Sequence, residues 1–307
     1  MANTIQPFDP RGSLQTNFPI ILERNGPISQ TIPILLYHSV SDQFDQRYGR
    51  WCVTPRRFEE QMSALAEGGF HAISISDLAQ KLAVGLPVPD RCVAVTFDDG
   101  LKDFQSGALP VLTKFGFAAT LYVVAGSVGK TSGWLAALGE DRRPMLQPED
   151  MLELLDAGIE IGAHSMTHPE LDILDRKAAC EEIRTSRIVL EDALSAPVQS
   201  FAYPFGYAST TTRALVRKAG FRSAVVVRHA LSSPDEDLFG LSRLIVTEQL
   251  SGSDLLELIH GKGAKPPAIQ HKIKTDIWRL VRRVRRLHRD GFSAGSRSES
   301  KDLGRMV

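Results

Sequence analysis

The stretch Cys92-Val-Ala-Val-Thr-Phe-Asp-Asp-Gly100 joins a run of mostly apolar residues to two adjacent carboxylates. Its first six residues read as a buried strand, because they form a short apolar run that ends at a turn signal. Asp98 and Asp99 then stand side by side where this strand ends. Two like charges resist being ionised together in a low-dielectric site, and a bound cation relieves that cost. The stretch therefore predicts a core strand that delivers a candidate cation site.

Strands and helices alternate along the chain on both sides of this stretch. The expected strands lie at 32–37, 71–75, 92–97, 118–124, 159–163, 199–202 and 223–227. The expected helices lie between Pro55 and Gly68, around 78–82, near 104–115, and at 148–156, 176–194 and 210–218. This alternation predicts an α/β protein with a parallel sheet covered by helices, and about seven units favour a barrel over an open sheet.

Polar residues follow several of the predicted strands. In a barrel of this kind the chemistry gathers at the C-terminal ends of the strands. At or just beyond such ends stand His38, Asp98, Asp99, His164 and Tyr203.

Asp99, His164 and His168 form a set of one carboxylate and two imidazoles. Three protein ligands of these types leave room for water and substrate on a catalytic metal, and Asp98 would then be free to act as general base. An Asp-Asp-Gly sequence also occurs as a plain turn, and a His-x-x-x-His pair also occurs on exposed helices. Here the second histidine precedes Pro169 and the first follows an apolar strand, which favours a strand-to-loop hinge.

Two further segments offer catalytic groups. His38 follows the first apolar strand and could protonate a leaving amine, because histidine titrates near neutral pH. Tyr203-Pro-Phe-Gly206 could form a fixed loop whose backbone N–H groups face a developing oxyanion. The alternative interpretations are a structural histidine and an ordinary turn with aromatic packing.

Composition limits the other function classes. The chain has 307 residues, and its three cysteines are too far apart for a metal knuckle or a disulfide framework. No apolar run is long enough to span a membrane, and the N-terminus lacks the pattern of a secretory signal. These features predict a cytoplasmic protein, which could also attach peripherally at the inner membrane face.

The charge is distributed unevenly, and this suggests three regions. Residues 263–307 hold 12 Lys and Arg against 4 Asp and Glu, whereas the formal net charge of the whole chain is zero. We expect an irregular arm at 1–30, a catalytic domain at 31–262, and a basic amphipathic helix at 271–289 within a flexible tail. That helix could lie on an anionic membrane, bind a glycan-assembly partner, or simply pack on the domain. Nucleic-acid binding is not expected, because no reader motif accompanies the charge.

The motifs Thr96-Phe-Asp-Asp-Gly100, His164-Ser-Met-Thr-His168 and Phe201-Ala-Tyr-Pro-Phe-Gly206 resemble those of the polysaccharide deacetylase family. This family is also known as the NodB-homology or carbohydrate esterase 4 family. The resemblance covers roughly residues 32–250. It implies a distorted (β/α)7-type barrel and a metal-dependent hydrolase that removes N-acetyl groups from N-acetylhexosamine units of a glycan, releasing acetate.

The resemblance also implies roles for single residues. Asp98 matches the family's catalytic base, and Tyr203 matches the residue whose backbone amide helps to form the oxyanion hole. The metal-binding triad is matched by Asp99, His164 and His168, with zinc the expected ion and nickel or cobalt as alternatives. The segments Leu35-Leu-Tyr-His-Ser-Val40 and Val53-Thr-Pro-Arg-Arg-Phe58 look like the poly-N-acetylglucosamine deacetylase branch, in which His38 matches the acid histidine.

The chain also departs from the commonest family pattern. Ala202 occupies the position where an arginine usually orients the base, and the Asp-rich fourth motif is not visible after residue 220. The terminal Leu-x-His motif is absent as well, because 254–260 reads as a helix and His260 is therefore not a candidate. Two rival functions stay open: hydrolysis of a non-glycan amide such as a ureide, and a non-catalytic module that binds a glycan or a membrane.

Overall fold

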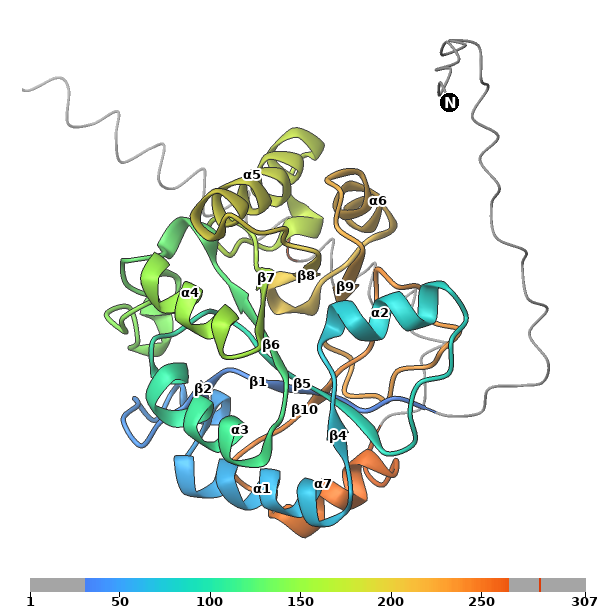
Figure 1. Cartoon of the computed structure of the whole chain (residues 1–307). Coiled ribbons are helices and arrows are strands. Elements are labelled where there is room, and N and C mark those ends of the chain that lie inside the picture. Colours follow the sequence, from blue (N-terminus) through green and yellow to red (C-terminus); the bar gives the residue numbers. More distant parts are fainter. Residues whose placement is uncertain (1–30, 265–281, 283–307) are drawn as a thin grey trace, which may run out of the picture.

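The computed structural model describes residues 31–264 and Arg282. Its centre is a curled parallel sheet, and helices surround it on the outside, as Figure 1 shows. The α/β barrel class predicted from the sequence is confirmed. The expected arm at 1–30 and the expected helix at 271–289, apart from Arg282, lie outside the described residues.

The strands follow the order β10-β1-β5-β6-β7-β8-β9, all paired in parallel, and β4 adds to β5. A separate small sheet pairs β2 with β3. Their bounds are β1 Ile34–Tyr37, β2 Ser39–Val40, β3 Cys52–Val53, β4 His71–Ala72, β5 Cys92–Phe97, β6 Ala119–Val123, β7 Ile159–Ala163, β8 Ser200–Ala202, β9 Ser223–Val225 and β10 Leu244–Ile245.

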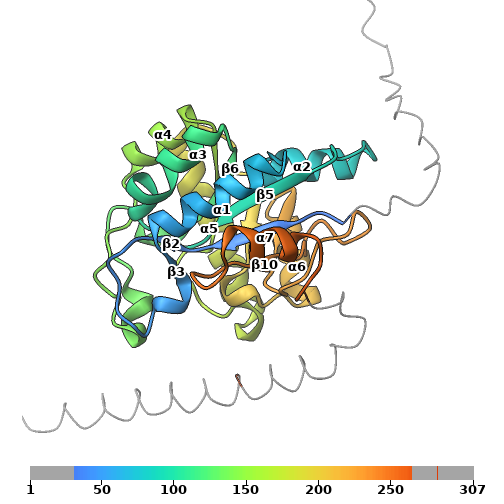
Figure 2. The same cartoon turned by 90° about the horizontal axis from the view of Figure 1, so that it is seen from below.

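The helices are α1 Pro55–Glu67, α2 Ile75–Ala83, α3 Leu109–Phe115, α4 Pro148–Asp156, α5 Arg176–Leu194, α6 Thr210–Lys218 and α7 Gly252–Ile259. A π-helical stretch, Phe104–Ala108, precedes α3 within the single helix predicted near 104–115. The helix α7 lies beside α1 in both views, so the end of the described domain returns to its beginning (Figures 1 and 2). The bounds of α7 confirm the helix predicted at 254–260, with His260 as its C-cap residue.

The strand predicted at 71–75 falls furthest short of its expected length. The expected strand at 71–75 ends after Ala72, because the Ser74 side chain accepts a hydrogen bond from the Asp77 N–H and begins α2 at Ile75. Serine is a strong N-cap for this reason. The apolar Ile75 therefore belongs to the buried face of a helix.

The chain after β9 joins the two edges of the sheet. Leu241 exchanges backbone hydrogen bonds with β9, since its N–H donates to Ala224 O at 3.0 Å and its C=O accepts from the Val226 N–H at 2.9 Å. Leu244 and Ile245 then pair with β1. This short connection curls the sheet toward closure and carries Arg243 between the two edges.

Aromatic packing fixes the end of β5, the strand that carries the two carboxylates. Every residue of β5 is buried, and the Phe97 ring lies 5.4 Å from Tyr37, 5.7 Å from Phe58 and 4.8 Å from Phe104 between ring centroids. Burial of one such side chain contributes roughly 1.5–3 kcal/mol. The residues that follow Phe97 therefore start from a rigid support.

Among the described residues, no helix is long and apolar enough to cross a membrane.

Candidate active site

The parallel register brings the predicted residues to one end of the sheet. Tyr37 of β1 pairs with Phe97 of β5, and the Asp98 N–H donates to Tyr37 O at 3.0 Å. The His164 N–H continues the ladder from β7 to Val123 O of β6 at 2.9 Å. His38, Asp98 and His164 therefore follow neighbouring strands at the same edge, as expected for a barrel of this class.

Asp98 is held by Arg243. The two carboxylate oxygens accept hydrogen bonds from Nη1 and Nη2 at 2.6 and 2.7 Å, and both side chains are buried. The guanidinium is fixed in turn by Thr96 Oγ1 at 3.2 Å and Val226 O at 3.3 Å. Although burial opposes ionisation, the charge and hydrogen bonds of Arg243 hold the pKa of Asp98 well below its usual range. Asp98 is therefore a carboxylate, as a general base must be.

Sequence reasoning missed Arg243. The position expected to hold an orienting arginine is Ala202, and the structure supplies the guanidinium from the connection before β10 instead. The available signal was a lone charged residue inside the apolar run Leu241-Ser-Arg-Leu-Ile-Val246. A buried arginine needs a partner of opposite charge, so this pattern predicts an ion pair but does not tell which carboxylate forms it.

Asp99 lies in the opposite electrostatic situation. Among the described residues it contacts no arginine side chain; its Oδ2 faces the Tyr48 hydroxyl at 3.5 Å and its Oδ1 lies 3.5 Å from His168 Nε2. Burial, and then the charge of Asp98, raise the pKa of Asp99 to about 8. The charge of Arg143 and the Tyr48 hydrogen bond act in the opposite direction but do not outweigh this rise.

The two histidines complete a tight cluster with Asp99. His164 Nδ1 lies 2.8 Å from Ala202 O, which fixes Nδ1 as the donor and leaves the Nε2 lone pair facing the acids. His164 Nε2 is 3.9 Å from both Asp98 Oδ2 and Asp99 Oδ1. Burial lowers the pKa of both histidines, so both are neutral and able to act as ligands.

The donor set fits a zinc-like ion. Asp99, His164 and His168 each offer one ligand atom, and these atoms lie within 4.8 Å of one another. Two imidazole nitrogens and one carboxylate oxygen suit zinc, nickel or cobalt, whereas magnesium and calcium prefer oxygen ligands. A dication there would also supply the charge that Asp99 lacks.

Left-handed backbone is concentrated at this cluster. Asp99 has φ 78°, Ser165 has φ 64°, His168 has φ 60° and Phe205 has φ 58°. Side chains other than glycine adopt this region at a cost, and such residues tend to persist where a site depends on them. The strain marks the Asp-Asp-Gly turn, the histidine loop and the Pro-Phe-Gly loop as one functional unit.

His38 lies at the edge of the site. Its ring is half-buried and lies 4.7 Å from the ring of Trp51, between centroids. Burial lowers the pKa of His38 to about 4, while the charge of Asp98 acts in the opposite direction. His38 is therefore neutral in the resting protein, and it lies close enough to Asp98 for that charge to affect its pKa.

The Tyr203 backbone amide is already used by the sheet. Its N–H donates to Val225 O at 3.3 Å, and its hydroxyl donates to Phe239 O at 3.1 Å. An oxyanion at the Tyr203 amide would therefore have to compete with Val225 for the same donor. Phe205, two residues on, is 53% exposed, and its ring lies 4.7 Å from that of His168.

Arg282 contacts the loops that border the site. Its guanidinium donates to both oxygens of Asp172, at 2.8 and 2.6 Å, and lies 3.7 Å from the centroid of the Tyr207 ring. Asp172 follows the histidine loop and Tyr207 follows the Pro-Phe-Gly loop. This arginine of the basic segment is thus packed against the domain.

Comparisons with known proteins relate this chain to deacetylases. A family model described as "Polysaccharide deacetylase" matches residues 85–224, which include Asp98, Asp99, His164 and His168. The Bacillus subtilis (strain 168) protein named "Putative polysaccharide deacetylase YxkH" is 28% identical over 222 residues, covering 72% of this chain and 74% of that protein. A Staphylococcus aureus (strain MRSA252) poly-beta-1,6-N-acetyl-D-glucosamine N-deacetylase is 19% identical, covering 64% and 69% of the two chains.

A solved structure shows the same fold. The Streptococcus pyogenes deacetylase PplD, in complex with acetate, superposes with a TM-score of 0.66 at 24% identity, covering 75% of this chain and 98% of that one. Fold, motifs and family model point the same way: the chain is similar to the polysaccharide deacetylase (NodB-homology) family, whose model matches residues 85–224.

Proposed function

We propose that the chain is a metal-dependent N-deacetylase that removes acetyl groups from N-acetylhexosamine units of a glycan and releases acetate. The observation that carries this proposal is the contrast between the two adjacent carboxylates. Asp98 is held ionised by Arg243, whereas Asp99 lies beside two neutral histidines and, within the described residues, forms no ion pair with an arginine or lysine. A base and a metal ligand are the roles that these two environments favour.

Asp99, His164 and His168 would hold the ion, with zinc as the first choice. When bound, such an ion polarises the acetyl carbonyl and makes a bound water easier to deprotonate. The chain's own contribution is to keep both imidazoles neutral by burial and to orient His164 through Ala202 O.

Asp98 would accept the proton of the attacking water. Arg243 keeps it ionised and fixes the direction of both oxygens, so the base needs no rearrangement. His38, at the end of the adjacent strand β1, would donate a proton to the leaving amine. The negative charge of Asp98 raises the pKa of His38, but burial outweighs it and leaves the resting side chain neutral, so His38 would have to take up a proton before it can donate one.

For the oxyanion we propose the Phe205 amide in place of that of Tyr203. Tyr203 N–H is bonded to Val225 O, and Pro204 has no N–H, so Phe205 carries the next available donor in the loop. Its left-handed backbone and its ring contact with His168 place this residue beside the metal-ligand cluster.

The catalytic unit that we propose is residues 31–262, and the proposed substrate class is an N-acetylated oligosaccharide. The name of the S. aureus relative makes β-1,6-linked N-acetylglucosamine oligomers the first candidates. A cytoplasmic location and a membrane or partner contact for 271–289 stay predictions.

Acetate release tests the proposal. The purified chain is incubated with N-acetylglucosamine oligomers of several linkages and with a cyclic ureide, before and after treatment with a chelator. We expect acetate from at least one oligomer, loss of activity with chelator, and recovery with zinc, nickel or cobalt. Ureide hydrolysis without acetate release would support the non-glycan amidohydrolase, and metal binding with no turnover of any substrate would support a non-catalytic module.

A further inference from the structure

The loop between the two histidines needs support from outside. His164 follows β7, but Ser165 and His168 both have left-handed backbone, so the loop is not held by regular structure. Within the loop, Ser165 Oγ accepts a hydrogen bond from the His168 N–H at 3.0 Å. On one side, the N–H groups of Ala125 and Gly126 donate to Ser165 O and Met166 O at 3.0 and 2.9 Å.

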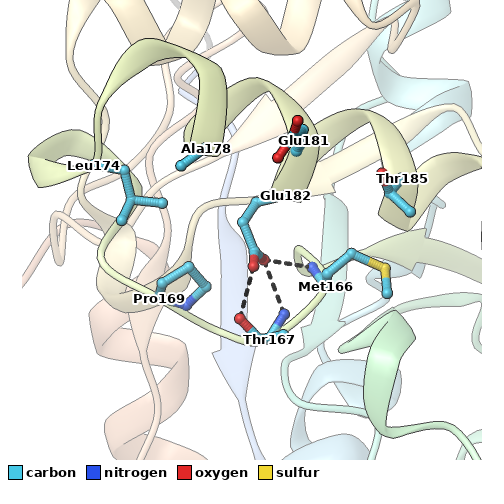
Figure 3. Close-up of a pocket in the computed structure, with 8 residues that line it drawn as sticks. All are labelled: Met166, Thr167, Pro169, Leu174, Ala178, Glu181, Glu182 and Thr185. Carbon is cyan, nitrogen blue, oxygen red and sulfur yellow. Dashed lines mark hydrogen bonds between the residues drawn. The ribbon is translucent and has the colours of Figure 1, made fainter.

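On the other side the loop is held by Glu182 of α5. Its Oε2 accepts hydrogen bonds from the N–H groups of Met166 and Thr167, both at 2.9 Å, and its Oε1 accepts from Thr167 Oγ1 at 2.7 Å. Figure 3 shows the carboxylate directed at the loop, with all three contacts converging on it. One side chain therefore satisfies two consecutive backbone donors that no strand or helix uses.

The helix makes Glu182 a rigid anchor. Asp175 caps α5 by accepting from the N–H groups of Lys177 and Ala178, and the adjacent Ile183 is 1% exposed in the core. Supporting groups on a packed helix hold a site more closely than groups on loops. The helical layer of the barrel thus sets the position of the histidine loop.

His168 depends on this anchor more than His164 does. The ring of His164 is oriented by Ala202 O, whereas His168 Nδ1 is buried without a hydrogen-bond partner within the described part of the chain. The His168 ring is bordered by Trp134 and Phe205, at 5.4 and 4.7 Å between centroids. Since no described residue forms a hydrogen bond with this Nδ1, packing and the loop backbone determine the place of the ring.

We propose that Glu182 is a positioning residue for the metal site: it holds the histidine loop so that His168 Nε2 meets Asp99. The inference rests on the proposed function, because it assumes that His168 is a metal ligand. Groups that orient metal ligands from outside the coordination shell typically change metal affinity about 10- to 100-fold when they are removed.

The surroundings of Glu182 make it suitable for substitution. A cavity of about 330 Å³ lies beside it, lined by Glu181 and Glu182 of the helix and by the loop (Figure 3). Removal of the carboxylate would let water reach the N–H groups of Met166 and Thr167 without disturbing the buried face of α5. We therefore expect Glu182→Ala to fold. If the alanine variant fails to fold, Glu182→Met replaces it, because methionine keeps the length of the side chain without its carboxylate.

The test compares zinc affinity across a matched series. Glu182→Ala should weaken zinc binding about 10-fold or more in calorimetry, and should change the visible absorption of the cobalt-loaded protein. Glu182→Gln should stay within about 3-fold of the original, because its amide oxygen can accept both N–H groups and its NH₂ can donate to Thr167. Glu181→Ala removes an exposed carboxylate from the same helix and cavity, and should leave affinity and spectrum unchanged.

The outcomes separate this inference from the proposed function. An original chain that binds no zinc overturns the metal site itself, and the inference with it. If the original chain binds zinc but Glu182→Ala (or Glu182→Met) binds equally well, only the positioning role fails. Equal weakening in Glu182→Gln and Glu182→Ala would assign the effect to negative charge and likewise overturn it. Faster hydrogen exchange at Met166 and Thr167 in Glu182→Ala, but not in Glu181→Ala, is the independent sign of a released loop.

Discussion

Asp98 and Asp99 are adjacent in sequence and equally buried, yet the protein treats them differently. Asp98 receives a bidentate arginine that is itself fully buried, and its pKa falls. Asp99 lies 3.5 Å from the Tyr48 hydroxyl and 3.5 Å from His168 Nε2, and its pKa is raised. Left-handed backbone at Asp99 turns its side chain away from Arg243 and toward the histidine loop. One residue of separation is therefore enough to divide the site into two electrostatic halves.

A pair of like charges can be kept in a buried site when each member is balanced in a different way. The chain neutralises one carboxylate with its own cation and leaves the other for an external one. A buried charge without a partner is strongly unfavourable, so the Asp99 half is complete only when a cation or a proton is bound. Substitutions can perturb each half separately.

The largest effect is expected from Asp98→Asn. This variant removes the base and keeps the shape, so kcat for acetate release should fall on the order of 1,000-fold, the range of general-base catalysis. Zinc content, measured by elemental analysis, should stay near one ion per chain as in the original. Full activity in this variant would show that Asp98 is not the base.

Asp99→Asn acts on the other half. Loss of the charged ligand should weaken zinc binding by at least about 100-fold, the upper range for loss of a single orienting group. Activity should fall in parallel and recover in part when excess zinc is added, which Asp98→Asn should not do. Comparison of the two variants in equilibrium dialysis decides whether the halves are separate, and identical zinc affinities would argue against this division.

Arg243→Lys tests what holds the base. Lysine keeps the charge but loses the paired geometry, so about one charged hydrogen bond disappears and kcat should fall roughly 10-fold. Arg243 lowers the pKa of Asp98, so a weaker partner lets that pKa rise, and the acid limb of the kcat/KM profile should move to higher pH. Added to Asp98→Asn, the change should have no further effect, and an unshifted acid limb in the single variant would contradict this role.

The fold and one half of the site could be predicted from the sequence. Apolar runs locate most of the parallel strands, because buried strands have no polar face, and their C-terminal ends locate Asp98, Asp99 and His164. The histidine spacing and the adjacent acids then predict the cluster that the structure shows. These signals are local, since each lies within a few residues of the chain.

The supports of the site were not predictable in the same way. Arg243 lies 145 residues from Asp98, and Glu182 reaches the histidine loop from a half-buried position on α5. Both side chains contact residues that are distant in the sequence, and their own sequence surroundings do not specify which residues those are. The Tyr203 amide shows the converse problem, because the loop sequence indicates a free donor and only the sheet register shows that Val225 uses it.

The smallest effect, and the most direct measure of the contrast, is proton release on zinc binding. Burial and the charge of Asp98 raise the pKa of Asp99 to about 8, so at pH 7 the metal-free site holds a proton there that zinc must displace. The pKa values of His164 and His168 are lowered, so neither histidine adds to the count at this pH. Calorimetry in buffers of different ionisation enthalpy should therefore give about one proton released at pH 7, falling toward zero as the pH rises above the pKa of Asp99.

In Asp98→Asn the like charge is absent, the pKa of Asp99 falls, and fewer protons should be released at pH 7. Release that is already absent at pH 7 in the original chain would mean that Asp99 is ionised without a metal, and the two halves would then not differ in charge.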